Sequence, residues 1–259
     1  MTTAIQSLWI GRKLSLIEQL CIKSYLALGY EFKLYIYDTV QNIPENTTIC
    51  DAKTILPEDA IFTSRTGSVA LFADWFRWKL LYEQGGIWVD MDLIGLKRFK
   101  KTPDIQFGCE EFGVPSIGYL KFPKKHALPR FMVNACEHPN RFLPYDSPRT
   151  RVKKAIRYIL GNNRANVGWG ESGGPIGFGK ALRYFDLMDR GEPYTAHYPV
   201  PAASWRHIFD DTFAHYPGMI GDAYAVHLWN EHIRRSQAKD SINNYSEKSL
   251  FAYLLKTIT

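Results

Sequence analysis

The sequence predicts an α/β protein in which helices flank a mixed, mainly parallel sheet. Strand-like segments alternate with segments of helical periodicity, and the chain opens with a strand, a helix and a second strand. Such an opening is typical of parallel, doubly wound sheets. The 46% hydrophobic content of the 259 residues allows a substantial core. We therefore expect one domain over residues 1–259, with helical additions.

The first hundred residues predict the order strand, helix, strand, helix, strand. Residues 4–10 are a short apolar run, 15–29 have apolar residues at helical spacing, and 31–38 alternate as a strand does. After a proline-containing connection, residues 69–84 again show helical periodicity. A Gly-Gly pair closes this helix, since glycine favours helix ends. The strand IWVDMD over 87–92 follows directly.

The remaining chain predicts further strands and helices in a less regular order. Strands are expected over 104–112, 116–122 and 223–229, and helices over 129–137, 151–161, 173–188 and 246–258. The last of these segments is amphipathic. No internal repeat or domain linker interrupts the pattern.

Composition excludes several classes of protein. No window approaches the roughly 20 apolar residues of a membrane-spanning helix, and no basic segment followed by a long apolar run begins the chain. Four distant cysteines without a Cys-x-x-Cys spacing favour buried thiols over a zinc site or disulfides. We expect a cytoplasmic protein, with peripheral contact at the inner membrane face as a further option.

Positive charge is concentrated in the middle third of the chain. Between residues 97 and 164 fifteen Lys or Arg face five Asp or Glu, a local excess of +10 that leaves −4 for the rest of the net +6. The clusters at 97–101, 121–126 and 149–154 favour a polyanionic partner such as lipid headgroups, a phosphorylated glycan or nucleic acid. A solvated basic face is the competing interpretation.

Two carboxylates, Asp90 and Asp92, stand one residue apart in an otherwise apolar segment. At positions i and i+2 of a strand their side chains point to the same face. Two such charges repel unless a cation lies beside them, and Mg²⁺ or Mn²⁺ prefers oxygen ligands together with substrate phosphates. Ligands of open α/β sheets bind beyond the carboxyl ends of the strands. The pair therefore predicts a metal-bridged phosphate ligand.

The segment ADWFRWKLLYEQGGIWVDMD places a small residue, Asp, Arg, Gly-Gly, an aromatic residue and Asp-x-Asp at a specific spacing, met by Ala73, Asp74, Arg77, Gly85, Gly86, Trp88, Asp90 and Asp92. It resembles the signature of DXD-containing glycosyltransferases with the GT-A fold. That group includes the yeast initiating mannosyltransferase, alpha-1,4-galactosyltransferases and the glucosyltransferase domain of large clostridial toxins. LWIGRKLS near the start and HLWN near the end resemble further segments of the group.

The resemblance implies a GT-A-like, Rossmann-like fold and a metal-dependent, retaining glycosyltransferase that uses a nucleoside-diphosphate sugar, most simply a UDP-sugar. Residues 1–100 then form the donor-binding half and 101–259 the acceptor-side half. The residues implied to bind the donor are Trp9, Ile10, Gly11, Arg12, Asp74, Arg77, Asp90 and Trp229. Those implied to hold Mn²⁺ or Mg²⁺ are Asp90, Asp92, His227 and Asn230, and the catalytic set is Asp90, Asp92 and Arg77.

Each of these roles has a structural alternative. Trp9 is expected to stack on the nucleobase and Trp229 to cover the nucleotide, and core packing is the alternative for both. Asp74 and Arg77 share a helical face, as donor ligands or as a plain ion pair. His227 competes with a packed histidine. The expected acceptor-side residues are Glu110, Glu111, Glu171, Ser172, Gly174, Lys124 and Lys125.

Three classes of function remain open. Family analogy favours a glycan or lipid-linked acceptor in surface polysaccharide synthesis. In the second class the basic 97–164 region holds DNA while the donor site glycosylates a base. The third is a non-catalytic protein that binds sugar nucleotides. Docking of the basic region and the amphipathic helix 246–259 on an anionic membrane is compatible with the first class.

Overall fold

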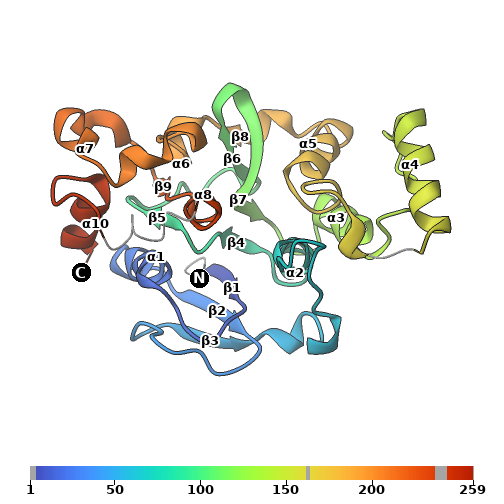
Figure 1. Cartoon of the computed structure of the whole chain (residues 1–259), viewed down its shortest axis with the longest axis horizontal. Helices are drawn as coiled ribbons and strands as arrows, with labels where there is room; N and C mark the ends of the chain where they lie inside the picture. Colours follow the sequence, from blue (N-terminus) through green and yellow to red (C-terminus); the bar gives the residue numbers. More distant parts are fainter. Residues whose placement is uncertain (1–3, 162–163, 237–243, 259) are drawn as a thin grey trace.

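The computed structural model describes residues 4–161, 164–236 and 244–258. They form a seven-stranded sheet with helices on both faces (Figure 1). The strand order is β3-β2-β1-β4-β7-β6-β8, and β5 pairs with β9 in a separate small sheet. The strands are β1 (Ile5–Trp9), β2 (Phe32–Ile36), β3 (Thr48–Asp51), β4 (Gly86–Val89), β5 (Leu93–Gly95), β6 (Gln106–Glu110), β7 (Val114–Phe122), β8 (Gly191–Glu192) and β9 (Ala225–His227).

The pairing confirms the mixed, mainly parallel sheet. β1 pairs in parallel with β2 and β4, β2 with β3, and β6 with β8. Only β7 runs against its neighbours β4 and β6. The sequence pattern missed β3, an edge strand that lies in the connection expected to be a loop. Its residues are only half-buried or exposed, so the apolar signal of a central strand is absent.

Two apolar layers cover the faces of the sheet. The helices are α1 (Leu16–Ala27), α2 (Ala70–Gln84), α3 (Ala127–Glu137), α4 (Pro148–Ile159), α5 (Pro175–Tyr184), α6 (Tyr194–His197), α7 (Thr212–His215), α8 (Asn230–Arg235) and α10 (Leu250–Ile258). α1 and α10 contribute to one layer and α2, α3 and α5 to the other. Successive strand residues alternate between the layers, as Ile87 and Trp88 do, because a strand has a side-chain period of two.

The turn from α2 into β4 requires glycine. Gly85 has φ +66°, and a Cβ there would lie 2.4 Å from the backbone nitrogen of Lys124. Gly86 has φ +95°, and its Cβ would lie 2.8 Å from Nε2 of Gln6. Both positions therefore combine a left-handed backbone with a close neighbour, and the predicted helix stop is confirmed.

The strand predicted over 87–92 ends earlier. β4 stops at Val89, and the amide of Leu93 donates to the carbonyl of Asp90 at 3.0 Å, so that residues 90–93 form a turn. The chain leaves the main sheet here because β5 pairs with β9. A turn, and not the alternation of a strand, thus brings the two aspartates together.

The amphipathic terminal helix packs on the core. In α10, Leu250, Phe251 and Leu254 are fully buried, so its apolar face is already covered; residue 259 of the expected segment lies outside the described residues. Among the described helices, no helix is long and apolar enough to cross a membrane. All four cysteines are free, and three of them are buried as expected, whereas Cys50 is partly exposed.

Candidate active site

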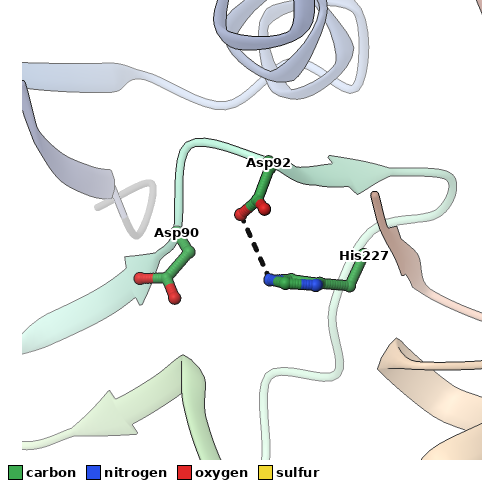
Figure 2. A group of neighbouring side chains, drawn as sticks. All are labelled: Asp90, Asp92 and His227. Carbon is green, nitrogen blue, oxygen red and sulfur yellow. Dashed lines mark ion pairs between the residues drawn. The ribbon is translucent and has the colours of Figure 1, made fainter. Parts of the chain in front are cut away.

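Three side chains from two distant parts of the chain meet beyond the carboxyl end of β4 (Figure 2). Asp90 and Asp92 lie on the turn between β4 and β5, and His227 is the last residue of β9. The β5–β9 ladder pairs Leu93 with His227, which carries the histidine to the turn. One ligand atom from each of the three lies within 4.8 Å of the other two.

Asp90 is held by one of its two oxygens. Oδ1 accepts hydrogen bonds from Arg77 Nη2 at 2.8 Å and from the indole Nε1 of Trp88 at 2.9 Å, while the Asp90 amide donates to the carbonyl of Gly118 at 2.8 Å. The side chain keeps 28% of its surface exposed. The carboxylate is therefore fixed in orientation, with Oδ2 left to face a ligand.

Asp92 and His227 form an ion pair in a nearly buried position. Asp92 Oδ1 lies 3.1 Å from His227 Nε2, and Oδ2 accepts from the amide of Asn230 at 2.8 Å. Although burial favours the protonated acid, His227 and the Asn230 amide lower the pKa of Asp92. Burial alone would lower the pKa of His227, but Asp92 raises it above its ordinary value.

The donor set fits a divalent cation. Ligand atoms bound to one ion at about 2.1–2.6 Å lie at most about 4–5 Å apart, which matches the cluster. The two carboxylates suit Mn²⁺ or Mg²⁺ when substrate oxygens complete the shell, whereas an imidazole ligand favours a transition metal over Mg²⁺. The amide of Trp229 donates to His227 Nδ1 at 3.3 Å, so Nε2 is the nitrogen directed at the carboxylates.

Asn230, expected to be a metal ligand, has a different set of contacts. Its amide nitrogen Nδ2 donates to Glu18 Oε1 at 3.0 Å, and its backbone amide binds Asp92. Glu18 is itself buried and completes the N-terminal cap of α1 with Ser15. Sequence reasoning missed Glu18, because its Ser-x-x-Glu spacing signals only a helix cap.

Asp74 and Arg77 lie on the face of α2 that borders the site. Arg77 Nη1 is 3.5 Å from Asp74 Oδ1, and its guanidinium lies over the Trp88 ring at 4.8 Å. Burial raises the pKa of Asp74 to about 6, against the opposing effect of Arg77. Within the described residues, Arg77 Nε and Nη1 have no hydrogen-bond acceptor. Arg77 thus links Asp74 to Asp90 and retains buried donors for a ligand oxygen.

Trp9 ends β1 at the same edge of the sheet as Asp90, because β1 and β4 are parallel. It is partly exposed, and its Nε1 has no acceptor among the described residues. A Cβ at Gly11 would lie 3.2 Å from that nitrogen, so the glycine lets the chain pass close to the indole. Ile10 is half-buried and Arg12 is exposed on the loop that follows.

Trp229 belongs to the core. It is 7% exposed, and its Nε1 donates to the carbonyl of Val200 at 2.8 Å. Its ring packs edge-on against the imidazole of His227, with 4.4 Å between the ring centroids. The ring of Tyr198 also packs against this imidazole, at a centroid distance of 5.5 Å. Core packing, the alternative left open by the sequence, is what the structure gives. Tyr198, which no sequence signal marked, supports the imidazole together with Trp229.

Among the expected acceptor-side residues, Glu110 lies at the edge of the site. β6 and β4 both run against β7, so their carboxyl ends share one edge of the sheet. Burial raises the pKa of Glu110, although His227 is near enough to oppose the shift. Glu111 is exposed, and Phe112 at the tip of this connection is 99% exposed with φ +59°.

Lys124 and Lys125 lie elsewhere. They follow β7, whose end is beside the start of β4, at the sheet edge opposite to Asp90. Lys125 pairs with Glu83 and covers the ring of Tyr82 at 4.3 Å. The antiparallel pairing of β7 with β4 therefore places these lysines away from the Asp90 edge.

The segment around the Gly-Pro turn packs against α2. A Cβ at Gly174 would lie 3.2 Å from Asp74 Oδ2, and the carbonyl of Gly173 accepts from Trp78 Nε1 at 2.6 Å. Ser172 is half-buried beside this turn. Glu171 turns away to Lys153 and Arg157 of α4, and these cations, against the effect of burial, lower its pKa to about 2.

Models of known protein families match both segments of the chain that form the site. Residues 18–107, which hold Asp74, Arg77 and the Asp-x-Asp turn, match the glycosyltransferase sugar-binding region containing DXD motif. Residues 190–254, which hold His227, match the alpha 1,4-glycosyltransferase conserved region. Both matches identify the protein as a glycosyltransferase with a DXD motif.

Curated relatives of this glycosyltransferase are lactosylceramide 4-alpha-galactosyltransferases. The protein of Pongo pygmaeus is 27% identical over 169 residues, which cover 62% of this chain and 67% of the relative. The protein of Homo sapiens is also 27% identical over 169 residues, but the match covers only 42% of its length. The glycosyltransferase thus aligns with less than half of the human relative.

A solved structure supports the fold. The ligand-free glycosyltransferase domain from the YGT toxin aligns with 100% of this chain and 94% of its own, at a TM-score of 0.53 and 9% sequence identity. The predicted GT-A-like architecture is confirmed on this basis and on the sheet topology.

Proposed function

We propose that the protein is a metal-dependent, retaining glycosyltransferase that moves a sugar from a UDP-sugar to a hydroxyl group of a glycan. The observation that carries this proposal is the cluster of Asp90, Asp92 and His227, which lies inside the family's matched segments at the carboxyl edge of the sheet. Ligands of open α/β sheets bind at that edge.

The charges of the site suit a diphosphate leaving group. Asp90, Asp92 and His227 would hold the cation, and a bound Mn²⁺ or Mg²⁺ neutralises the negative charge that develops on the diphosphate. Arg77 fixes Asp90 through its 2.8 Å hydrogen bond and keeps unused donors beside the sugar position. Arg12 is exposed on the loop after β1, and in this proposal it would bind the phosphates.

Trp9 and the names of the relatives bear on the donor and on the stereochemistry. Trp9 offers an aromatic face at the edge where the nucleobase would lie, which suits any base. The curated relatives are named as 4-alpha-galactosyltransferases. Transfer that keeps the configuration of an α-linked nucleoside-diphosphate sugar gives an α-linked product, so we infer a retaining reaction and make UDP-galactose the first donor to test.

The acceptor would enter between the turn and the β6–β7 connection. Glu110 lies at this edge beside Ser116, and its carboxylate would accept hydrogen bonds from sugar hydroxyls. Phe112, fully exposed in a left-handed conformation, presents an aromatic face at the tip of the same connection. A polar group beside an exposed aromatic ring suits a sugar, which has both hydroxyls and apolar C–H faces.

The distribution of basic residues favours a glycan over DNA as acceptor. Lys97 pairs with Asp222 at 2.7 Å, Lys154 with Asp146 at 2.6 Å, and Lys125 with Glu83. Several of the fifteen cations of the 97–164 region are therefore paired within the protein. A phosphate backbone needs several unpaired cations in one track, since each contact contributes through released counterions.

The test is donor hydrolysis across a panel of nucleotide-sugars with Mn²⁺, with EDTA, and with the Asp92→Ala variant. We expect one donor to be hydrolysed only with the metal, and Asp92→Ala to abolish turnover. Asp59→Ala, which removes an exposed carboxylate far along the chain from the motif, is the matched control and should retain activity.

Two results would contradict the proposal. Turnover that persists in EDTA would show that the reaction does not require a metal. Nucleotide binding without any turnover would show that the protein binds sugar nucleotides but is not a catalyst. Once a donor is known, the anomeric configuration of the product, determined by NMR, decides between retention and inversion. Salt-dependent binding to DNA that competes with the glycan would instead favour the nucleic-acid acceptor.

A further inference from the structure

α4 is amphipathic in the opposite sense to the other helices. Its apolar residues Val152, Ile156 and Ile159 recur at helical spacing, and their exposed fractions are 58%, 51% and 79%. Leu160, which follows the helix, is 80% exposed. These four residues form one apolar stripe, because positions i, i+4, i+7 and i+8 share a face. We call it the α4 stripe.

Two of the five basic side chains of α4 face the protein instead. Lys154 is the only buried residue of the helix, and its Nζ donates to Asp146 at 2.6 Å and to the carbonyl of Arg141 at 3.0 Å. Arg157, whose side chain is 9% exposed, pairs with Glu171 at 2.7 Å and donates to the carbonyl of Pro139 at 3.0 Å.

This orientation is set by specific contacts. Hydrogen bonds and ion pairs hold the polar side against the body, so the helix does not simply lie loose with its stripe outward. A helix that sits on a domain normally buries its apolar face, and a contiguous exposed apolar surface marks an interaction site. The α4 stripe therefore requires a partner that covers it.

Charge identifies the kind of partner. α4 contains five basic and no acidic residues, and the two carboxylates that pair with it, Asp146 and Glu171, leave it net positive. Arg149, Arg151 and Lys153 are exposed. At 100° per residue, Arg151 and Lys153 lie on opposite flanks of the stripe. An apolar stripe bordered by cations is complementary to an anionic lipid surface.

We propose that α4 docks the protein on an anionic bilayer, with the α4 stripe inserted at the boundary between headgroups and acyl chains and the flanking cations on lipid phosphates. This inference goes beyond the proposed transfer reaction and does not depend on it. In this proposal α4 contacts the membrane, and the terminal helix does not, because the apolar face of α10 is buried in the core.

The position of α4 leaves the active site accessible. Figure 1 shows α4 at one end of the long axis, beyond α3 and α5, while β4 lies near the middle and β5 and β9 lie toward the other end. A bilayer in contact with this end would not cover the turn that holds Asp90 and Asp92. Docking and catalysis can therefore be tested separately.

The experiment is co-sedimentation of the full chain with phosphatidylcholine vesicles, with and without phosphatidylglycerol. We expect binding only when the anionic lipid is present, and weaker binding at high salt. The double variant Ile156→Glu/Ile159→Glu should lose binding by at least about tenfold, since it places two charges in the inserted stripe. Arg149→Glu/Arg151→Glu should weaken binding by a similar factor.

Ile49→Glu is the matched control, because Ile49 is 58% exposed but lies on the edge strand β3. It should bind vesicles as the wild type does. Thermal unfolding and donor hydrolysis verify that each variant is folded. Failure of the wild type to bind anionic vesicles, or unchanged binding of Ile156→Glu/Ile159→Glu, would overturn the proposal. Wild-type self-association that these variants abolish, without vesicle binding, would assign the stripe to a second copy of the chain.

Discussion

Replacing Arg77 by methionine should destabilise the fold through the two carboxylates that the arginine bridges. Arg77 is 5% exposed and contacts Asp90 at 2.8 Å and Asp74 at 3.5 Å. Removing one partner of a buried ion pair costs about 3–5 kcal/mol, because the remaining charge is left uncompensated. Methionine keeps much of the side-chain volume, so the loss reports charge more than packing.

The contribution of Asp74 to this loss of unfolding free energy has an upper limit. Because burial already raises its pKa to about 6, proton uptake at pH 7 costs only about 1.4 kcal/mol. Asp74 therefore becomes neutral once the arginine is gone, and the remaining loss falls on Asp90 and on the Trp88 contact. We expect Arg77→Met to lose about 3–4 kcal/mol in total.

The pH dependence has a defined sign. The folded pKa of Asp74 lies above its ordinary value of 3.8, so the folded state binds the proton more tightly than the unfolded state does. The penalty for the ionised carboxylate is present above pH 6 and is relieved as pH falls through 6 toward 4. Because Arg77→Met raises this pKa further, the variant should recover stability relative to the wild type on acidification.

The assay is urea unfolding followed by tryptophan fluorescence at pH 7, on Arg77→Met, Asp74→Asn and the double variant. Asp74→Asn should restore at least about 1 kcal/mol in the Arg77→Met background, a coupling typical of residues in contact. Lys79→Met, which removes a partly exposed partner of Glu83 on the same helix, should cost under about 1 kcal/mol. An Arg77→Met loss as small as this control, or no rescue by Asp74→Asn, would refute the reasoning.

Three further outcomes are expected. His227→Gln should weaken Mn²⁺ binding by at least about tenfold in calorimetry, and unchanged affinity would remove His227 from the site. Gly85→Ala should lower the free energy of unfolding by more than about 2 kcal/mol, whereas Gly67→Ala, with φ +76° but no atom within 4 Å, should lose only about 1 kcal/mol; equal losses would contradict the steric argument. Glu171→Gln should lower the melting temperature at pH 7, but progressively less below pH 4.5. The pKa of Glu171 is depressed, so its carboxylate stabilises the fold only while it is ionised. A difference in melting temperature that persists at pH 2 would assign the effect to packing.

Local sequence was sufficient where the physical cause is local. The α2 helix and its glycine stop follow from periodicity and from backbone conformations that only glycine adopts easily, and both were predicted. The Asp-x-Asp pair and its resemblance to glycosyltransferases pointed to the carboxyl edge of the sheet, where Asp90 and Asp92 lie. The family and the fold class were thus available before any coordinates.

Tertiary structure decided which distant groups complete the site. His227 reaches Asp92 only because β9 pairs with β5, and Glu18 reaches Asn230 only because α1 and α8 meet there. Pairing of remote segments depends on the whole core, so no local pattern announces it. The same reason explains two positions that the sequence did not show: the antiparallel β7 carries Lys124 to the opposite edge of the sheet, and Trp229 packs in the core.

The sequence by itself determined most of the elements, the aspartate motif and the family resemblance, because these depend on spacing and side-chain chemistry. It also showed that 149–154 is basic, but not that α4 turns Lys154 and Arg157 inward and its apolar stripe outward. That orientation depends on Asp146 and Glu171, which lie outside the helix and are placed by the fold. Only the tertiary structure could decide it, because the same amphipathic pattern fits a helix facing either way.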